Sequence, residues 1–465
     1  MTTTRAATAL ADATFFPFWL DRADAPAASD PLLGGTRADL VVVGGGFTGL
    51  WAAILAKESD PSLDVVLIEA DRIAHGASGR PGGIVSTSVM HGLGNAARIF
   101  PQDIQALEAL GHDNMAGFTD TIRRHDIQAD LEWTGEMTVA VSDAGLPAVH
   151  EEYELHRAHG HDVALLDAQQ TRAQLNSPLF QGALWSRKNS GIVHPARLAW
   201  GLRRAALALG VRVHEQTPMT GVDDRGDRLL VRTRDGAVET PRVLFATNAF
   251  AAGHRRIRSR VAMVRDRILT TEPLTPEQKA AVGWANRQGV YDTRTQLNYM
   301  RLTPDDRILF GGRLGYFMNN PRDPALDRTP EPYLRLADAF FATFPQLEGI
   351  RFSHAWSGPI ALTTRMAVHF QTYYGGKAVY AGGYSGFGVS ASRFGARVGL
   401  AKLTGQHLPE TRMEFAATEP NWIPPEPFRT IGAKITMAAL DGADSKGGWR
   451  LPWLRLCSKI GFPLS

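Results

Sequence analysis

Apolar and polar positions divide the chain into short strands and amphipathic helices. A buried-strand run, Leu40 to Val43, leads directly into the glycine-rich segment Gly44 to Gly49. An apolar helical stretch, Leu50 to Ala56, follows, and then a second apolar strand, Val65 to Ile68. This order of strand, glycine turn, helix and strand predicts a βαβ unit of an α/β nucleotide-binding domain.

The glycine turn of this unit carries its chemistry. Its glycines allow a tight turn, a close approach of the backbone to a pyrophosphate, and close packing of helix on strand. The helix start adds free N–H groups and a positive dipole that hold phosphates. A glutamate ends the second strand, where its carboxylate accepts hydrogen bonds from ribose hydroxyls and repels the 2′-phosphate of NADP. The expected cofactor-binding residues of this unit are Gly44, Gly46, Phe47, Thr48, Gly49 and Glu69.

Further along, helical spacing from Ile104 to Ile127 is followed by a strand-like alternation at 131–141 and a helix at 196–209. Short strands are expected at 211–215, 229–233 and 243–246. The last of them ends in the small-residue turn Thr247-Asn248-Ala249, which can lie close to a bound nucleotide.

Several strand-like runs between Val261 and Phe317 predict an antiparallel sheet. A strand at 379–381 then enters a second glycine-rich turn, 382–388, and a helix at 389–403. We therefore expect two interleaved domains. The nucleotide-binding domain would comprise residues 37–95, 191–255 and 350–420, the substrate domain 96–190 and 256–349, and a helical, basic and aromatic tail 421–465.

The amino-acid composition argues against several classes of protein. The 465 residues can hold two domains, and a content of 21% charged and 44% hydrophobic residues is that of an ordinary soluble protein. A net charge of +3 does not indicate a nucleic-acid binder. The single cysteine, Cys457, excludes disulfides within the chain, and we expect no metal site. The first residues lack an apolar signal region and no run reaches membrane-spanning length, so a cytoplasmic location is expected.

Four segments resemble the D-amino-acid oxidase/glycine oxidase superfamily of FAD enzymes, and within it the γ-glutamylputrescine oxidase-like proteins. They are residues 39–49 with Glu69-Ala70, the loop 72–83, the segment 297–313, and the turn 382–388. The resemblance covers about residues 37 to 420 in the same order. It implies an α/β, two-domain (α+β) fold, with a Rossmann-like FAD-binding domain interleaved with a substrate domain on an antiparallel sheet.

The resemblance also implies roles for individual residues. Arg72, Ser78 and Arg80 would neighbour the phosphates or the flavin, and Met219 would lie on the strand that meets the adenine. For Met219, simple core packing is an open alternative. The other cofactor-binding residues implied are Ala70, Gly82, Gly83, Thr247, Gly358, Gly383, Ser385, Gly386, Phe387, Gly388 and Val389.

Two departures from the family pattern concern the flavin. Relatives that bind FAD covalently through histidine place it where Arg80 stands, and Cys457 is too far along the chain to form a cysteine link. FAD is therefore expected to be non-covalent. Phe387 stands where γ-glutamylputrescine oxidase and sarcosine oxidase types have a histidine. A positive charge near the flavin stabilises developing negative charge on oxygen, so fast reaction with oxygen is in doubt.

The expected chemistry is oxidation of an amine or amino-acid-like substrate. Hydride would pass from the carbon beside nitrogen to flavin N5, and the imine would hydrolyse to a carbonyl compound. The candidate catalytic pocket consists of Tyr299, Arg301, Trp356 and Phe387. Tyr299 and Arg301 alternate with Met300, so both can project from one sheet face. An ordinary cross-strand pair at the sheet surface is the alternative.

Two alternative functions are also compatible with the sequence. Tail residues such as Trp449 and Leu456 alternate with Arg450 and Arg455, as in a segment that lies on a membrane surface. That pattern suits a membrane-associated FAD dehydrogenase that passes electrons to quinone. A third reading is a flavoprotein component of an electron-transfer complex. The expected partners are a small-molecule amine and oxygen or another electron acceptor; an oligomer is also open.

Overall fold

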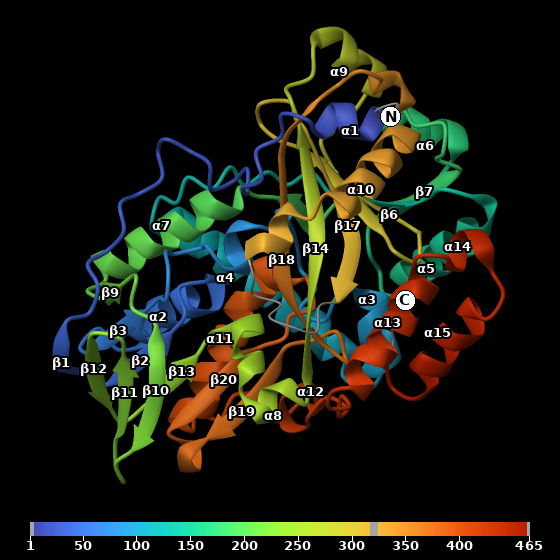
Figure 1. The fold of residues 1–465 in the computed structure, drawn as a ribbon. Helices are drawn as coiled ribbons and strands as arrows, with labels where there is room; N and C mark the ends of the chain where they lie inside the picture. The colour runs from blue at the N-terminus through green and yellow to red at the C-terminus, as the bar shows by residue number, and fades with distance from the viewer. Residues whose placement is uncertain (1–3, 317–323, 463–465) are drawn as a thin grey trace.

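The computed structural model describes residues 4–316 and 324–462. A six-stranded sheet holds the expected unit of β2 (Leu40–Val43), α2 (Phe47–Ser59) and β3 (Val65–Ile68). Strands from distant parts of the chain lie beside it, as Figure 1 shows. The strand order is β19 (His369–Tyr373), β20 (Ala378–Gly382), β13 (Val243–Phe245), β2, β3 and β9 (Arg212–His214). Every neighbouring pair is parallel except β19 with β20.

The two faces of this sheet pack against different layers because successive side chains on a strand point to opposite faces. Leu40 and Val42 join the core formed with the helices α2, α7 (Pro195–Ala208) and α11 (Gly388–Thr404). Val41 and Val43 join a second core, under a four-stranded sheet. That sheet has the order β1 (Gly34–Arg37), β12 (Gly236–Thr240), β11 (Leu229–Thr233) and β10 (Met219–Asp224).

An eight-stranded sheet forms the other half of the molecule (Figure 1). Its order is β18 (Phe352–Thr363), β14 (Val261–Thr271), β17 (Ile308–Tyr316), β16 (Asn298–Leu302), β15 (Gly289–Asp292), β5 (Glu136–Ala140), β7 (Gly182–Ser186) and β6 (Val163–Asp167). Its pairs are antiparallel except β15 with β5. Met300 and Phe310 pack in one core with α10 (Pro330–Thr343) and α1 (Arg5–Leu10), and Tyr299 projects to the opposite side.

Shorter elements connect and cover these sheets. The strands β4 (Ile84–Ser86) and β8 (Ser190–Ile192) form a two-stranded antiparallel ribbon. The remaining α-helices before the tail are α3 (Leu93–Ile99), α4 (Ile104–Arg124), α5 (Leu146–Ala158), α6 (Ala168–Gln174), α8 (Arg255–Arg258), α9 (Pro276–Val282) and α12 (Glu414–Ala417).

The C-terminal tail folds back onto the eight-stranded sheet. It contains α13 (Phe428–Leu440), α14 (Ala443–Lys446) and α15 (Arg450–Lys459). Asp444 accepts a hydrogen bond of 2.9 Å from the backbone N–H of Thr295, and Asp441 accepts one of 2.7 Å from Gln296. Within the described ranges, no helix combines the length and apolar character needed to span a bilayer.

The fold class expected from the sequence is confirmed, and most elements lie where the pattern places them. The division into domains stays a prediction. Strand pairing assigns β18 to the eight-stranded sheet, although the sequence analysis places residues 350–420 in the nucleotide-binding domain. Phe317, the end of the expected antiparallel region, lies outside the described residues.

Candidate active site

One continuous cavity of about 1530 Å³ joins the carboxyl ends of the nucleotide-binding strands to the face of the eight-stranded sheet. Gly44, Gly46 and Glu69 line one end. Tyr299 and Glu136 line the other, together with residues of α4 and α5. Ligands of open α/β sheets bind outside the carboxyl ends of the strands, so the first end is the expected position for a dinucleotide.

The glycine turn leaves the room that a pyrophosphate needs. Gly44 has a φ of 112°, and a Cβ atom on it would lie 2.8 Å from the carbonyl oxygen of Ala246. A Cβ on Gly49 would lie 1.8 Å from the carbonyl oxygen of Gly44, so Gly49 serves helix–strand packing and does not line the cavity. The backbone N–H of Phe47 donates to Ser78 Oγ at 2.9 Å. Phe47, Thr48 and Ser78 all line the cavity.

Glu69 is held in place by backbone donors. Its carboxylate accepts hydrogen bonds from the N–H groups of Gly45, at 2.6 Å, and Asp71, at 3.0 Å. Both oxygens keep further lone pairs, and Glu69 and Ala70 line the cavity. This carboxylate can accept ribose hydroxyls, so the residues present fit the adenosine half of FAD.

The structure separates the remaining expected nucleotide contacts into two groups. Met219, on β10, and Thr247, after β13, line the cavity. Arg72 does not, because its guanidinium donates to the carbonyl oxygen of Pro26. Gly383 is also behind the wall: its N–H donates to Asn248 Oδ1 at 2.9 Å. Because neither Arg72 nor Gly383 lines the cavity, the structure does not support the direct contact with the cofactor that the sequence predicts for them.

Arg80 links the loop 80–83 to β18, the edge strand of the eight-stranded sheet. Its guanidinium donates to the carbonyl oxygen of Ser357 at 2.7 Å and pairs with Asp327 at 3.2 Å. Burial lowers the pKa of Arg80, and the Asp327 carboxylate opposes this shift. Arg80 lines the cavity together with Gly82, Gly83 and Gly358.

Tyr299 meets this loop from the sheet. A Cβ on Gly82 would lie 2.8 Å from Cε2 of Tyr299, so the ring lies directly against the loop. The Tyr299 hydroxyl donates to Asp266 Oδ2 at 2.6 Å, and both residues line the cavity. Burial raises the pKa of Asp266 to about 6. Asp266 has a single signal in the sequence, the charged run 265–267 within a mostly apolar strand.

Two of the expected pocket residues lie behind the cavity wall. Arg301 is fully buried and donates to the carbonyl oxygens of Val193, at 2.8 Å, and Gly83, at 3.2 Å. Trp356 is also fully buried and donates through Nε1 to the carbonyl oxygen of Arg80 at 2.9 Å. Neither lines the cavity. Alternation with Met300 does put Arg301 on the same side as Tyr299, but its guanidinium supports the loop instead of facing the cavity.

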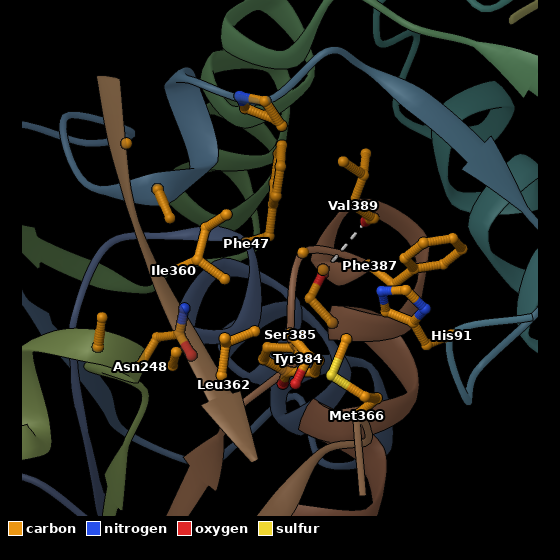
Figure 2. Close-up of a pocket in the computed structure, with 18 of the residues that line it drawn as sticks. Phe47, His91, Asn248, Ile360, Leu362, Met366, Tyr384, Ser385, Phe387 and Val389 are labelled. Carbon is orange, nitrogen blue, oxygen red and sulfur yellow. Dashed lines mark hydrogen bonds between the residues drawn. The ribbon is translucent and has the colours of Figure 1, made fainter. Parts of the chain in front are cut away.

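The second glycine-rich turn covers another stretch of the wall, shown in Figure 2. The cavity-lining residues of this turn and the start of α11 include Tyr384, Ser385, Gly386, Phe387, Gly388 and Val389. The ring of Phe387 lies against His91. Burial lowers the pKa of His91 to about 4, so its imidazole is neutral near pH 7. No pattern in the sequence around His91 indicates this contact.

Comparisons with known proteins agree with this geometry. Gamma-glutamylputrescine oxidoreductase of Escherichia coli (strain K12) is 30% identical over 414 residues, covering 87% of this chain and 93% of the relative. Probable oxidoreductase OrdL of Haemophilus influenzae is 29% identical over 383 residues, covering 81% and 85%.

Solved structures share the fold. Glycine oxidase from Geobacillus kaustophilus has a TM-score of 0.67 at 18% identity, covering 80% of this chain and 96% of that one. L-proline dehydrogenase from P. horikoshii has a TM-score of 0.65 at 20% identity, covering 82% and 98%. The sequence model of the DAO family, described as FAD dependent oxidoreductase, matches residues 39–400. This chain therefore belongs to the DAO family of FAD-dependent oxidoreductases, as its motifs predict.

Proposed function

We propose that the protein oxidises the C–N bond of an amine to an imine, which water then hydrolyses to a carbonyl compound. The observation that carries this proposal is the continuity of the cavity. It leads from the nucleotide-binding turn past the loop 80–83 to Tyr299 and Asp266 on the sheet, so that a substrate placed there would reach a flavin bound along the first half. FAD supplies the redox chemistry, because its N5 accepts hydride from the carbon beside nitrogen.

The residues of the chain orient the substrate and exclude water. Tyr299 and Phe387 both line the cavity with aromatic surface, one from β16 and one from the turn before α11. Gly82 leaves the backbone of the loop 80–83 open to the ring of Tyr299. We propose that Gly82, Gly83 and Gly358 lie close to the flavin ring and that the FAD is non-covalent.

The charges around the cavity favour an amine over a simple α-amino acid. Seven carboxylates and four guanidiniums line it among the described residues. Each of the four guanidiniums has a partner in the protein: Asp327 for Arg80, Asn95 for Arg98, Asp292 for Arg294 and Asp441 for Arg313. Arg365 does not line the cavity and donates to Thr418 Oγ1 at 2.6 Å. An extended amine is therefore the substrate class that we propose.

Anaerobic titration tests the proposal. Purified holoprotein is mixed with γ-glutamylputrescine, N-acetylputrescine, putrescine and glycine while the flavin absorbance is recorded. We expect bleaching by at least one of the first three and none by glycine. If the bound flavin is not reduced by any of these amines, the proposal of amine oxidation is rejected. Admitting air to the bleached sample then separates an oxidase from a dehydrogenase.

A specific observation favours a second candidate, a dehydrogenase that delivers electrons to quinone at a membrane surface. Around α15 the side chains of Trp449, Leu451, Leu456 and Ile460 are 43–59% exposed, and Arg450, Arg455 and Lys459 lie among them. Such a basic, apolar segment suits an anionic bilayer surface. Co-sedimentation with vesicles that contain anionic lipid tests this, with protein lacking residues 446–465 as the control. Equal sedimentation of both proteins would exclude the role of the tail.

A further inference from the structure

A carboxylate faces the substrate end of the cavity without a direct ion pair among the described residues. Asp266 is 8% exposed and lies on β14. Its Oδ2 accepts the hydrogen bond of 2.6 Å from the Tyr299 hydroxyl. Among the described residues, neither oxygen forms an ion pair, and the carboxylate's other hydrogen-bonding contact is with its own backbone N–H. A buried carboxylate without a positive partner lowers the stability of the fold, and a cationic ligand would offset that cost.

Two cavity-lining glycines lie beside the Asp266–Tyr299 pair. Asp266 is the direct partner of Gly358 across the β14–β18 pair. A Cβ on Gly358 would lie 3.8 Å from Asp266 Oδ1, and a Cβ on Gly82 would lie against the Tyr299 ring. A side chain at Gly82 would displace the Tyr299 ring, whereas a Cβ at Gly358 would make an ordinary contact with Asp266. The pair therefore lies where the loop 80–83 meets the sheet, beside the expected flavin position.

The arginines near Asp266 bind groups other than its carboxylate. Arg265, on the same strand, and Arg80, from the loop, both pair with Asp327. Arg267 donates to the carbonyl oxygen of Arg265 at 3.0 Å. Tyr299 is the titratable group in direct contact with the Asp266 carboxylate. Burial raises the pKa of Asp266 to about 6, and the Tyr299 hydrogen bond and the two arginines of its own strand oppose this shift.

We propose that Asp266 binds the amino group of the substrate and accepts its proton, and that Tyr299 holds the carboxylate in place. This inference rests on the proposed amine oxidation. An alkylammonium group has a pKa of about 10 in water, and burial in the cavity lowers it. An N–H bond of the ammonium breaks, an O–H bond forms on Asp266, and the electron pair stays on nitrogen. The substrate becomes the neutral amine, the form that can lose hydride.

The binding of a cation that cannot be oxidised tests the site apart from turnover. tert-Butylamine has no hydrogen on the carbon beside nitrogen, and tert-butanol is its neutral counterpart. Each is titrated into the holoprotein between about pH 5 and pH 8, and the perturbation of the flavin absorbance gives the dissociation constant. We expect tert-butylamine affinity to fall as the pH drops through about 6, while tert-butanol affinity stays constant.

Substitutions assign the titration to Asp266. Asp266→Asn keeps the volume and an acceptor for Tyr299, and should abolish the pH dependence and weaken tert-butylamine binding by about 30-fold. Tyr299→Phe removes a hydrogen bond that lowers the pKa of Asp266, so the midpoint should move to higher pH. This shift would not arise from a purely structural role. Glu136→Gln changes a second carboxylate of the cavity and should leave the midpoint in place. Flavin content and thermal unfolding verify that each variant is folded.

The outcomes separate the two proposals. An Asp266→Asn protein that retains the titration, or a Glu136→Gln protein that loses it, would overturn the role of Asp266. If Asp266→Asn does not fold, an unmoved midpoint in Tyr299→Phe overturns it equally. If no amine reduces the flavin but tert-butylamine binding still depends on Asp266, the cation-binding site at Asp266 is supported and the proposed amine oxidation is rejected.

Discussion

The imidazole of His91 lies on the ring of Phe387, with the ring centroids 4.1 Å apart and the planes inclined by 38° (Figure 2). His91 has a φ of 59°, in the left-handed region, so its backbone conformation is unusual for a residue with a side chain. The contact joins the loop before α3 to the turn before α11. It puts a neutral imidazole and a phenyl ring together on the cavity wall.

This pair predicts slow reaction of the reduced protein with oxygen, because neither ring carries a positive charge. Phe387→His should accelerate reoxidation by about tenfold or more, since a protonated imidazole stabilises the developing negative charge. Phe387→Leu, which changes the ring without adding charge, should not. Stopped-flow absorbance of photoreduced holoprotein mixed with aerated buffer measures both rates. Equal acceleration in the two variants would show that access, and not charge, limits the reaction.

The burial of His91 also predicts a pH dependence of stability. Its pKa in the folded protein, about 4, lies below its ordinary value of 6.5. Between these values the unfolded chain binds more protons, so stability is complete above about pH 6.5 and falls on acidification. From about pH 7.5 to pH 5, His91 alone should remove about 2 kcal/mol.

Denaturant unfolding of the holoprotein and of His91→Asn at these two pH values measures the difference. Asparagine accepts the left-handed backbone and does not titrate in this range. The wild-type protein should therefore lose about 2 kcal/mol more than the variant. Equal losses would mean that His91 is already protonated or exposed in the folded state.

Gly49 provides a test of the nucleotide-binding turn. A Cβ there would lie 1.8 Å from the carbonyl oxygen of Gly44, so Gly49→Ala must move α2 away from β2. We expect loss of bound FAD and destabilisation by about 3 kcal/mol, as for other overpacked core positions. Gly94→Ala is the matched control. That glycine lies in α3 with no atom within 4 Å of the added Cβ, so FAD content should be unchanged. Reconstitution of the apoprotein followed by flavin fluorescence measures both.

Arg301 offers a test of its observed position behind the cavity. Arg301→Met would leave the carbonyl oxygen of Val193 without its donor, while that of Gly83 would keep the backbone N–H of Val193, and should destabilise the protein by about 3 kcal/mol. The protein that retains FAD should keep its KM for the amine, because the guanidinium does not line the cavity. Thermal unfolding and steady-state kinetics check the two effects. A stable variant with a strongly raised KM would instead give Arg301 a direct role in the pocket.

Sequence alone predicts the nucleotide-binding half well because its signals are local. Four successive apolar residues from Leu40 to Val43, the glycines behind them and Glu69 form one continuous pattern. The alternation of Tyr299, Met300 and Arg301 likewise gives their sides of the sheet correctly. Alternation predicts the side of the sheet but not how deeply a side chain is buried. It therefore does not predict that Tyr299 lines the cavity whereas Arg301 is held behind it by the carbonyl oxygens of Val193 and Gly83.

The parts that escape prediction depend on contacts between distant segments. Asp266 meets Tyr299 only because β17 lies between β14 and β16 and carries Gly311, which leaves room for the Tyr299 ring. His91 and Phe387 are nearly 300 residues apart and share no sequence pattern. The C-terminal tail docks through contacts between residues far apart in the sequence, such as the hydrogen bond from Thr295 to Asp444 and the ion pair of Arg313 with Asp441. Such pairings follow from the assembled sheets and not from local periodicity.

The strand order of the nucleotide-binding sheet has a consequence for how the protein is made. The centre of the sheet, β13, pairs on one side with β2 and on the other with β20, and these three strands come from early, middle and late parts of the chain. During synthesis the first glycine turn leaves the ribosome long before β20, and the turn that follows β20 completes the cavity wall. Sheets closed by such distant pairings fold slowly. The nascent chain must therefore wait for about its first 400 residues before it can enclose FAD, and cofactor loading is a late event in its maturation.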